Sequence, residues 1–179
     1  FADTWSFAAN VKNAQKTASR FSTIKGYDEL QDPNVDPKAT LSGLLKSNFV
    51  SEVEGKPTSL YVLKNKNGLE ACITNYGGRM VSLMAPDKNG KMTDVVLGYD
   101  SISDYLKSDG NFGALIGRYG NRIAQGKFSL DSVEYQLPQN NNGHCLHGGP
   151  EGYHTRLWDA KQLNDQTLEL TYLSKDGEA

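Results

Sequence analysis

The feature that most restricts the fold is a two-residue hydrophobic period that begins at Leu60 and continues to the end of the chain. The runs "SLYVLKN" and "LEACITNY" flank Asn67-Gly68, a dipeptide typical of tight hairpin turns. Three further strand pairs follow, with turns expected at Asn89-Gly90, near Asp131-Ser132 and around Asn164-Asp165. Short strands at this spacing predict an antiparallel all-β sandwich or barrel, and not βαβ units.

The first part of the chain has a different period. In "DTWSFAANVKNAQKTASRFSTIKG", apolar residues recur every three or four positions, which predicts a helix over about Ser6–Ser22. The following "DELQDPNVDPKAT" contains two prolines and four acidic residues and is typical of a linker. We therefore expect a helical extension with its linker over residues 1–38 and a β domain over residues 39–179.

The end of the chain suggests that more protein belongs to the fold. In "LTYLSKDGEA" a predicted strand is followed by the start of a turn. A sheet ending there has its last strand as an exposed edge. We expect such an edge, and we interpret the chain as the front part of a larger protein.

Composition excludes several classes of function. The net charge of −2 gives no attraction for nucleic acid or for an anionic membrane surface. No apolar run approaches the ~20 residues of a membrane span. Two cysteines are too few for a disulfide framework, and Cys72 lies in an apolar strand-like run where a buried thiol is expected. The sequence predicts no nucleic-acid partner and no membrane partner, and it leaves the compartment open between cytoplasm and bacterial periplasm.

All three histidines lie in "NNGHCLHGGPEGYHTRLW", together with Cys145. The His144-x-x-His147 spacing falls in a glycine-rich loop, which lacks the hairpin or helix that usually holds zinc ligands. The Cys145 thiol has no recognisable base and orienting partner. "GNRIAQGKF" has five residues between its glycines and no hydroxyl after the lysine, so it is not a phosphate loop. The sequence therefore predicts neither a metal site, a nucleophilic thiol nor a nucleotide site.

A polar cluster in "GRYGNRI" remains as candidate chemistry. It contains two arginines, Arg118 and Arg122, whose planar guanidinium groups each donate several hydrogen bonds, and Asn121, whose amide both donates and accepts. Such groups suit the paired hydroxyl groups of a sugar. Alternatively, the two arginines make structural contacts to loop carbonyls. The residues alone leave both interpretations open.

These segments resemble the aldose 1-epimerases, also called galactose mutarotases. "GALIGRYGNRIAQGKF" and the later "LHGG" with a nearby tryptophan are similar to that family's motifs, and "ITNYGGRMVSLMAPDKNGKMTDVVLGYDSISDYL" is similar to its opening strands. The resemblance runs from about Leu60 to Ala179 and does not reach the N-terminal extension. It implies a large antiparallel β-sandwich of the galactose mutarotase type with the sugar in an open cleft.

The resemblance also implies a function and its site residues. The reaction interconverts the α and β anomers of a free hexose by acid/base ring opening, without metal or organic cofactor. Asn121, Arg122 and His147 match the sugar-contacting positions, whereas His144 and His154 are expected to point elsewhere, His154 at the surface. A phosphosugar epimerase and a non-catalytic carbohydrate-binding protein of the same fold remain alternatives.

No catalytic residue is assigned within this chain. The family's acid histidine and base glutamate lie further along than Ala179, so we expect them downstream. Besides the hexose substrate, the expected partner is therefore the remaining C-terminal part of the same protein.

Overall fold

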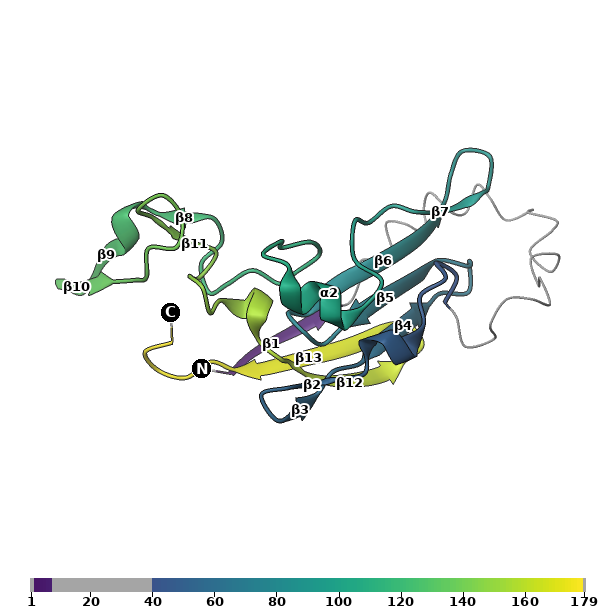
Figure 1. Cartoon of the computed structure of the whole chain (residues 1–179), viewed down its shortest axis with the longest axis horizontal. Helices are drawn as coiled ribbons and strands as arrows, with labels where there is room; N and C mark the ends of the chain where they lie inside the picture. Colours follow the sequence, from purple (N-terminus) through teal and green to yellow (C-terminus); the bar gives the residue numbers. More distant parts are fainter. Residues whose placement is uncertain (1, 8–39, 179) are drawn as a thin grey trace.

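The computed structural model describes residues 2–7 and 40–178, and these form two main antiparallel sheets (Figure 1). The four-stranded sheet has the order β4-β5-β6-β7 and the three-stranded sheet the order β1-β13-β12. The first comprises β4 (Leu60–Lys64), β5 (Glu70–Thr74), β6 (Arg79–Pro86) and β7 (Met92–Asp94). The second comprises β1 (Ala2–Phe7), β12 (Asp159–Asn164) and β13 (Thr167–Leu173).

All four predicted hairpin turns are confirmed by the strand pairing. They join β4 to β5, β6 to β7, β12 to β13, and β9 (Lys127–Leu130) to β10 (Val133–Gln136). One strand lies earlier than expected: the sequence places the partner of β6 in the run "DVVLGY", but β7 covers Met92–Asp94 and shares only Asp94 with that run. The Asp94 carboxylate accepts hydrogen bonds from the backbone N–H groups of Leu83 and Val96, which turns the chain out of the sheet.

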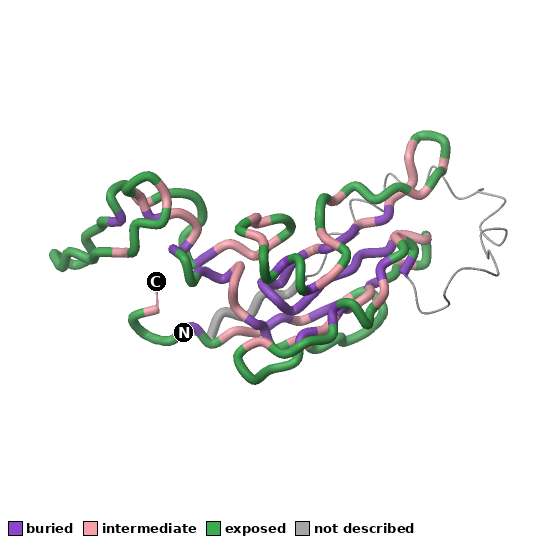
Figure 2. The backbone as a smooth tube through the Cα atoms, in the orientation of Figure 1, coloured by how far each residue is buried: buried purple, intermediate pink, exposed green. Residues whose placement is uncertain are grey.

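The core lies on both faces of β5, every residue of which is buried (Figure 2). Ala71 and Ile73 face the second sheet, where they pack with Trp158, Leu168 and Leu170. The other face of β5 carries Cys72, which packs in a second cluster with residues such as Phe49, Ile102 and Tyr105. The predicted β-sandwich is thus confirmed, with one core between the sheets and another under a covering layer.

Short elements make this covering layer. They are η3 (Lys46–Phe49), the ribbon of β2 (Glu52–Val53) and β3 (Lys56–Pro57), and helix α2 (Ile102–Lys107). Ser101 caps α2, because its side-chain oxygen accepts the backbone N–H of Asp104. Helix α2 was not expected from the sequence, because its six residues are too few to show a helical period.

The N-terminal residues correct two expectations. Ser6 and Phe7, placed at the start of a helix, lie in β1, which pairs antiparallel with β13. The rest of that predicted helix falls outside the described residues. Strand β13 is consequently not an exposed edge, since it lies between β1 and β12. Pairing satisfies the backbone groups that β13 would otherwise expose, and this outweighs the helical pattern at Ser6 and Phe7.

An arm of residues 118–149 projects from the two sheets (Figure 1). It contains β8 (Arg122–Ile123) paired with β11 (Cys145–Leu146), the short η4 (Ala124–Gly126), and the β9–β10 hairpin. A last turn, η5 (Tyr153–Thr155), leads the chain back to β12. Most of the arm is exposed (Figure 2). In the described part of the chain, no helix has the length and apolar character to cross a bilayer.

Candidate functional site

Two of the predicted sugar-contacting residues bond each other directly at one end of the β8–β11 ribbon. The backbone N–H of Asn121 donates to Nδ1 of His147 at 3.0 Å, and the backbone N–H of His147 donates to the carbonyl oxygen of Asn121 at 2.9 Å. The ribbon fixes this meeting, because Arg122 pairs with Leu146 and each is the chain neighbour of one of the two residues. Residues 26 positions apart are thereby held together by main-chain geometry.

The backbone of this pair is strained. Asn121 has φ of 67° and His147 has φ of 57°, both in the left-handed region that residues other than glycine adopt infrequently. His147 lies in the turn that the N–H of Gly149 closes on the carbonyl oxygen of Leu146, and Asn121 lies in the bend before β8. Strained backbone held in place by the surrounding structure is characteristic of functional positions.

The hydrogen bond to His147 also fixes its tautomer. Because Nδ1 accepts the N–H of Asn121, a neutral His147 carries its proton on Nε2. The free nitrogen of the ring is therefore a hydrogen-bond donor. A donor in this position suits an oxygen atom of a sugar.

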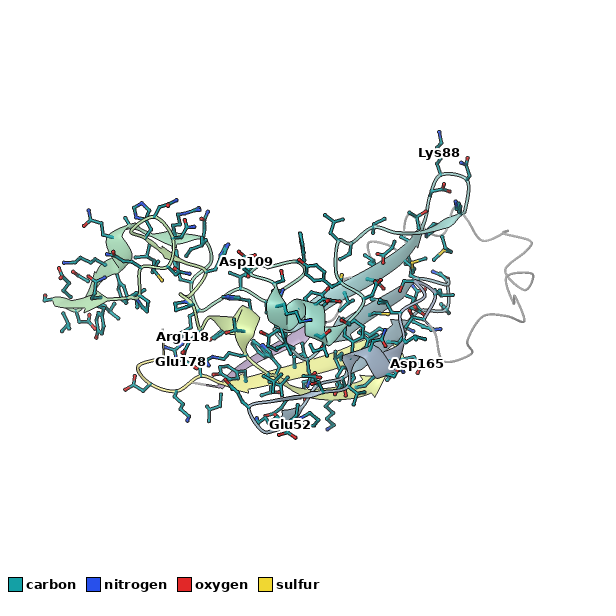
Figure 3. The ribbon with its side chains drawn as sticks, viewed as in Figure 1. Glu52, Lys88, Asp109, Arg118, Asp165 and Glu178 are labelled. Atoms are coloured by element: carbon teal, nitrogen blue, oxygen red, sulfur yellow. The ribbon has the colours of Figure 1, made fainter. Side chains whose placement is uncertain are left out.

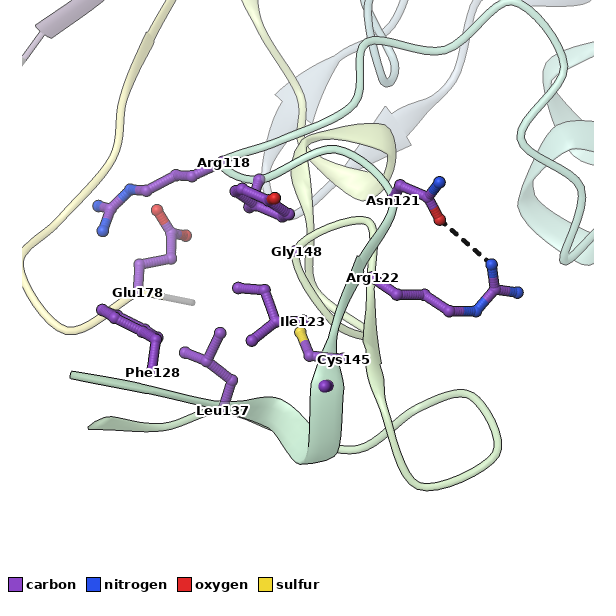
Figure 4. Close-up of a pocket in the computed structure, with 11 residues that line it drawn as sticks. Arg118, Asn121, Arg122, Ile123, Phe128, Leu137, Cys145, Gly148 and Glu178 are labelled. Atoms are coloured by element: carbon purple, nitrogen blue, oxygen red, sulfur yellow. Dashed lines mark hydrogen bonds between the residues drawn. The ribbon is translucent and has the colours of Figure 1, made fainter. Parts of the chain in front are cut away.

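Arg122 completes the cluster. Its Nε donates to Oδ1 of Asn141 at 3.1 Å and its Nη1 to Oδ1 of Asn121 at 3.2 Å (Figure 4). The side chain is exposed, and among the described residues it forms no ion pair. Two amide oxygens thus orient a guanidinium group whose charge no carboxylate of the described residues neutralises.

Arg118 has the structural role that the sequence left open for both arginines. Its Nη2 donates to Oγ of Ser174 at 2.6 Å and to the carbonyl oxygen of Lys175 at 2.7 Å. These bonds tie the start of the arm to the C-terminal segment, where Arg118 lies beside Glu178 (Figure 3). The two arginines therefore differ, since Arg122 contacts side-chain amides and Arg118 a loop carbonyl.

A pocket of about 530 Å³ lies beside the cluster (Figure 4). Its lining is largely apolar, with Ile123, Phe128, Leu137 and Cys145 among the lining residues, and Arg118 and Glu178 lie together on one side. Asn121 and Arg122 also line it, but the Arg122 guanidinium extends away from that side, and His147 is not among the lining residues. The structure therefore joins the three predicted residues at the surface next to the pocket, and their role as sugar contacts stays a prediction.

Glu178 is a charged pocket residue that sequence reasoning missed. Its carboxylate accepts hydrogen bonds from Tyr172 Oη at 2.5 Å and Ser174 Oγ at 2.7 Å, and pairs with Arg156 at 2.8 Å. Burial acts to raise the pKa of Glu178, but the hydrogen bonds from Tyr172 and Ser174 and the charge of Arg156 outweigh it and lower the pKa. Burial and the bond to Glu178 raise the pKa of Tyr172 to about 12. Glu178 is consequently an ionised structural anion near neutral pH and a poor proton acceptor.

The other two histidines do not bond with the cluster. Nδ1 of His144 accepts the backbone N–H of Gln125 at 3.0 Å. His154 was expected at the surface, but it is half-buried, because the glycine-rich loop folds back against the turn at Gly77. Its Nδ1 is buried without a hydrogen-bond partner among the described residues. Burial, with smaller contributions from the charges of Arg79 and His147, lowers the pKa of His154.

Both cysteines are free of disulfides and buried, which confirms the expectation for Cys72. Burial raises the pKa of both thiols, which disfavours the reactive thiolate. Over residues 2–7 and 40–178, no three histidine, cysteine, aspartate or glutamate side chains gather in a way that could hold a metal ion.

Comparison with known proteins shows which family the chain resembles. Residues 59–179 match the family model described as aldose 1-epimerase. The chain is 41% identical over 110 residues to the galactose mutarotase of Bos taurus, covering 62% of this chain and 32% of that protein. It is 32% identical over 125 residues to the aldose 1-epimerase of Escherichia coli (strain K12), covering 70% and 36%.

The fold also resembles that of a solved structure. The crystal structure of galactose 1-epimerase from Lactobacillus acidophilus superposes with a TM-score of 0.61 at 25% identity, covering 71% of this chain and 37% of that one. The chain spans about a third of the length of the relatives it matches.

Proposed function

Because this chain belongs to the aldose 1-epimerase family, we propose that the protein it forms part of interconverts the α and β anomers of free hexoses such as glucose or galactose. The observation that carries the proposal is the bonded cluster of Asn121, Arg122 and His147. These three residues lie within the matched region, and the structure brings them together with donors that no carboxylate of residues 2–7 and 40–178 occupies.

The reaction consists of proton transfers and one bond exchange. A base removes the proton from the anomeric hydroxyl while an acid protonates the ring oxygen, and the bond between C1 and that oxygen breaks. The open aldehyde rotates about its bond to C2, and the ring closes on the opposite face by the reverse proton transfers. No electron is transferred to an acceptor, so we propose no metal or organic cofactor.

In this scheme the three residues bind and orient the hexose. His147 donates from Nε2, Arg122 offers its remaining N–H groups to neighbouring hydroxyls, and the Asn121 amide positions the guanidinium. A positive charge beside the ring oxygen also stabilises negative charge as the ring opens. Arg122 cannot exchange protons near pH 7 and Asn121 does not titrate, so we assign both to binding.

The proton-transfer pair is proposed to come from the remaining C-terminal part of the protein. His147 alone could fill one role, and Glu178 is held as an anion by its own partners. General acid or base catalysis contributes on the order of 10²–10⁴-fold per group, so we expect feeble mutarotation from residues 1–179 alone.

A hexose titration tests the binding part of this proposal. Adding D-galactose or D-glucose to ¹⁵N-labelled protein should shift the amide signals of Asn121 and His147, and Arg122→Ala should weaken the apparent affinity at least about tenfold. His144→Ala is the matched control, because His144 lies in the same loop and also accepts a backbone N–H at Nδ1. Shifts confined to other parts of the fold, or equal affinity in the Arg122→Ala protein, would refute the assignment.

A further inference from the structure

Arg79, at the start of β6, is a buried cation bound only to uncharged groups among the described residues. It is 2% exposed, and its guanidinium carbon lies 5.6 Å from the ring centre of Tyr76 and 5.2 Å from that of Tyr105. No carboxylate pairs with it in the described part of the chain. Burying such a charge costs free energy unless polar groups and aromatic faces compensate. An apolar side chain could fill the same space without that cost, so the charge indicates a further role.

The hydrogen bonds of Arg79 go to two separate segments. Nη1 donates to the carbonyl oxygens of Gly110 at 3.0 Å and Phe112 at 3.2 Å, and Nη2 donates to the carbonyl oxygen of His154 at 3.0 Å. The first segment leads directly to Asn121 and Arg122, and the second follows His147. One guanidinium group thus bridges the two loops that carry the cluster.

The turn preceding Arg79 reinforces this bridge. The carbonyl oxygen of Gly77 accepts the N–H of Leu115 at 2.9 Å, and the N–H of Gly77 donates to the carbonyl oxygen of Arg156 at 2.7 Å. A Cβ at Gly77 would lie 2.3 Å from the carbonyl oxygen of His154, so the second segment packs closely on this turn. Both loops are therefore held by hydrogen bonds and close packing against the same turn, which precedes β6 in the first sheet.

We infer that Arg79 is a positioning residue for the hexose site: it holds the two loops in the register at which Asn121 and His147 bond each other. The inference rests on the proposed function for the identity of the ligand, but the loop register itself exists without sugar. A planar fork of donors reaches three carbonyls in two directions, which a lysine ammonium cannot reproduce from the same position. A positive charge alone is therefore not enough to hold both loops, and the planar geometry of the guanidinium group is required.

The test compares Arg79→Lys and Arg79→Met with Lys64→Met as a control. Lys64 pairs with the fully buried Glu70 at 2.8 Å in the other half of the sheet, so its loss removes a buried charge partner without touching the two loops. The first readout is the ¹⁵N spectrum of the histidine rings without sugar, which is tractable because the chain has 3 histidines. The second is hexose affinity, and KM against kcat in the complete enzyme.

In the wild type and in Lys64→Met, His147 should show the Nε2–H tautomer. In both Arg79 variants the tautomers should mix, and hexose affinity should fall about tenfold to a hundredfold through KM as well as kcat. If Arg79→Met does not fold, Arg79→Lys decides the question alone.

An unchanged His147 ring signal in a folded Arg79→Lys protein would overturn the inference. So would equal losses in the Lys64→Met control, because these would show a general effect of stability. A wild type that binds no hexose would refute the proposed function, while the ring spectra would still decide whether Arg79 sets the loop register.

Discussion

At the residue scale, what a side chain can bind depends on which of its atoms already form hydrogen bonds within the protein. His144 and His147 lie three positions apart and both accept a backbone N–H at Nδ1, yet only His147 bonds a residue of the candidate cluster. The sequence motif made His147 a candidate, but the bond that fixes its tautomer depends on the β8–β11 pairing. Sequence reasoning missed Glu178 because its role depends on Tyr172 and Arg156, which come near it only in the fold.

His154 provides a prediction on pH at this scale. Its pKa is lowered in the folded protein, chiefly by burial, so the unfolded chain takes up the proton first as the pH falls. The stability associated with neutral His154 is fully present above the unfolded pKa of about 6.5 and is lost as the pH falls from there towards the lower folded pKa. Urea unfolding at pH 7.5 and 5.5 should show a loss of stability that is smaller in His154→Gln. An NMR titration with a His154 pKa at or above 6.5 would contradict this.

At the scale of elements, close contact between loops positions the site. Gly148 follows His147 with φ of +83°, and a Cβ there would lie 1.9 Å from the carbonyl oxygen of Gly117, which belongs to the segment leading to Asn121. The hairpins themselves could be predicted, because an Asn-Gly turn between alternating runs is a local signal. Helix α2 could not, because its six residues are too few to show a helical period, and the pairing of β1 with β13 could not, because it joins segments distant in the sequence.

Two glycine substitutions separate backbone strain from the contact between these loops. Gly143 has φ of +77°, and a Cβ added there would meet no atom within 4 Å. Gly143→Ala should therefore lower the free energy of unfolding by about 1 kcal/mol through backbone strain alone. Gly148→Ala adds the clash with Gly117 and should cost at least about 2 kcal/mol more. Denaturant unfolding of both variants measures the difference. Equal costs would show that the loops do not pack as described.

At the scale of the whole molecule, the fold class followed from periodicity, whereas the arrangement of the sheets did not, and the assignment of the candidate site rests on motif resemblance. Residues 59–179 carry the family match, and strand β1 from the other end of the chain completes the second sheet. The predicted exposed edge at β13 was wrong for this reason. Local patterns cannot show which distant strand will supply a missing partner.

The central claim is that Asn121, Arg122 and His147 form the hexose site of an aldose 1-epimerase. The most direct measurement is polarimetry of α-D-galactose mutarotation by the complete protein, comparing the wild type with His147→Ala and His144→Ala. The account predicts that His147→Ala lowers kcat/KM by on the order of 10²-fold or more, and that His144→Ala stays within about twofold of the wild type. Equal activity of the two variants would contradict it.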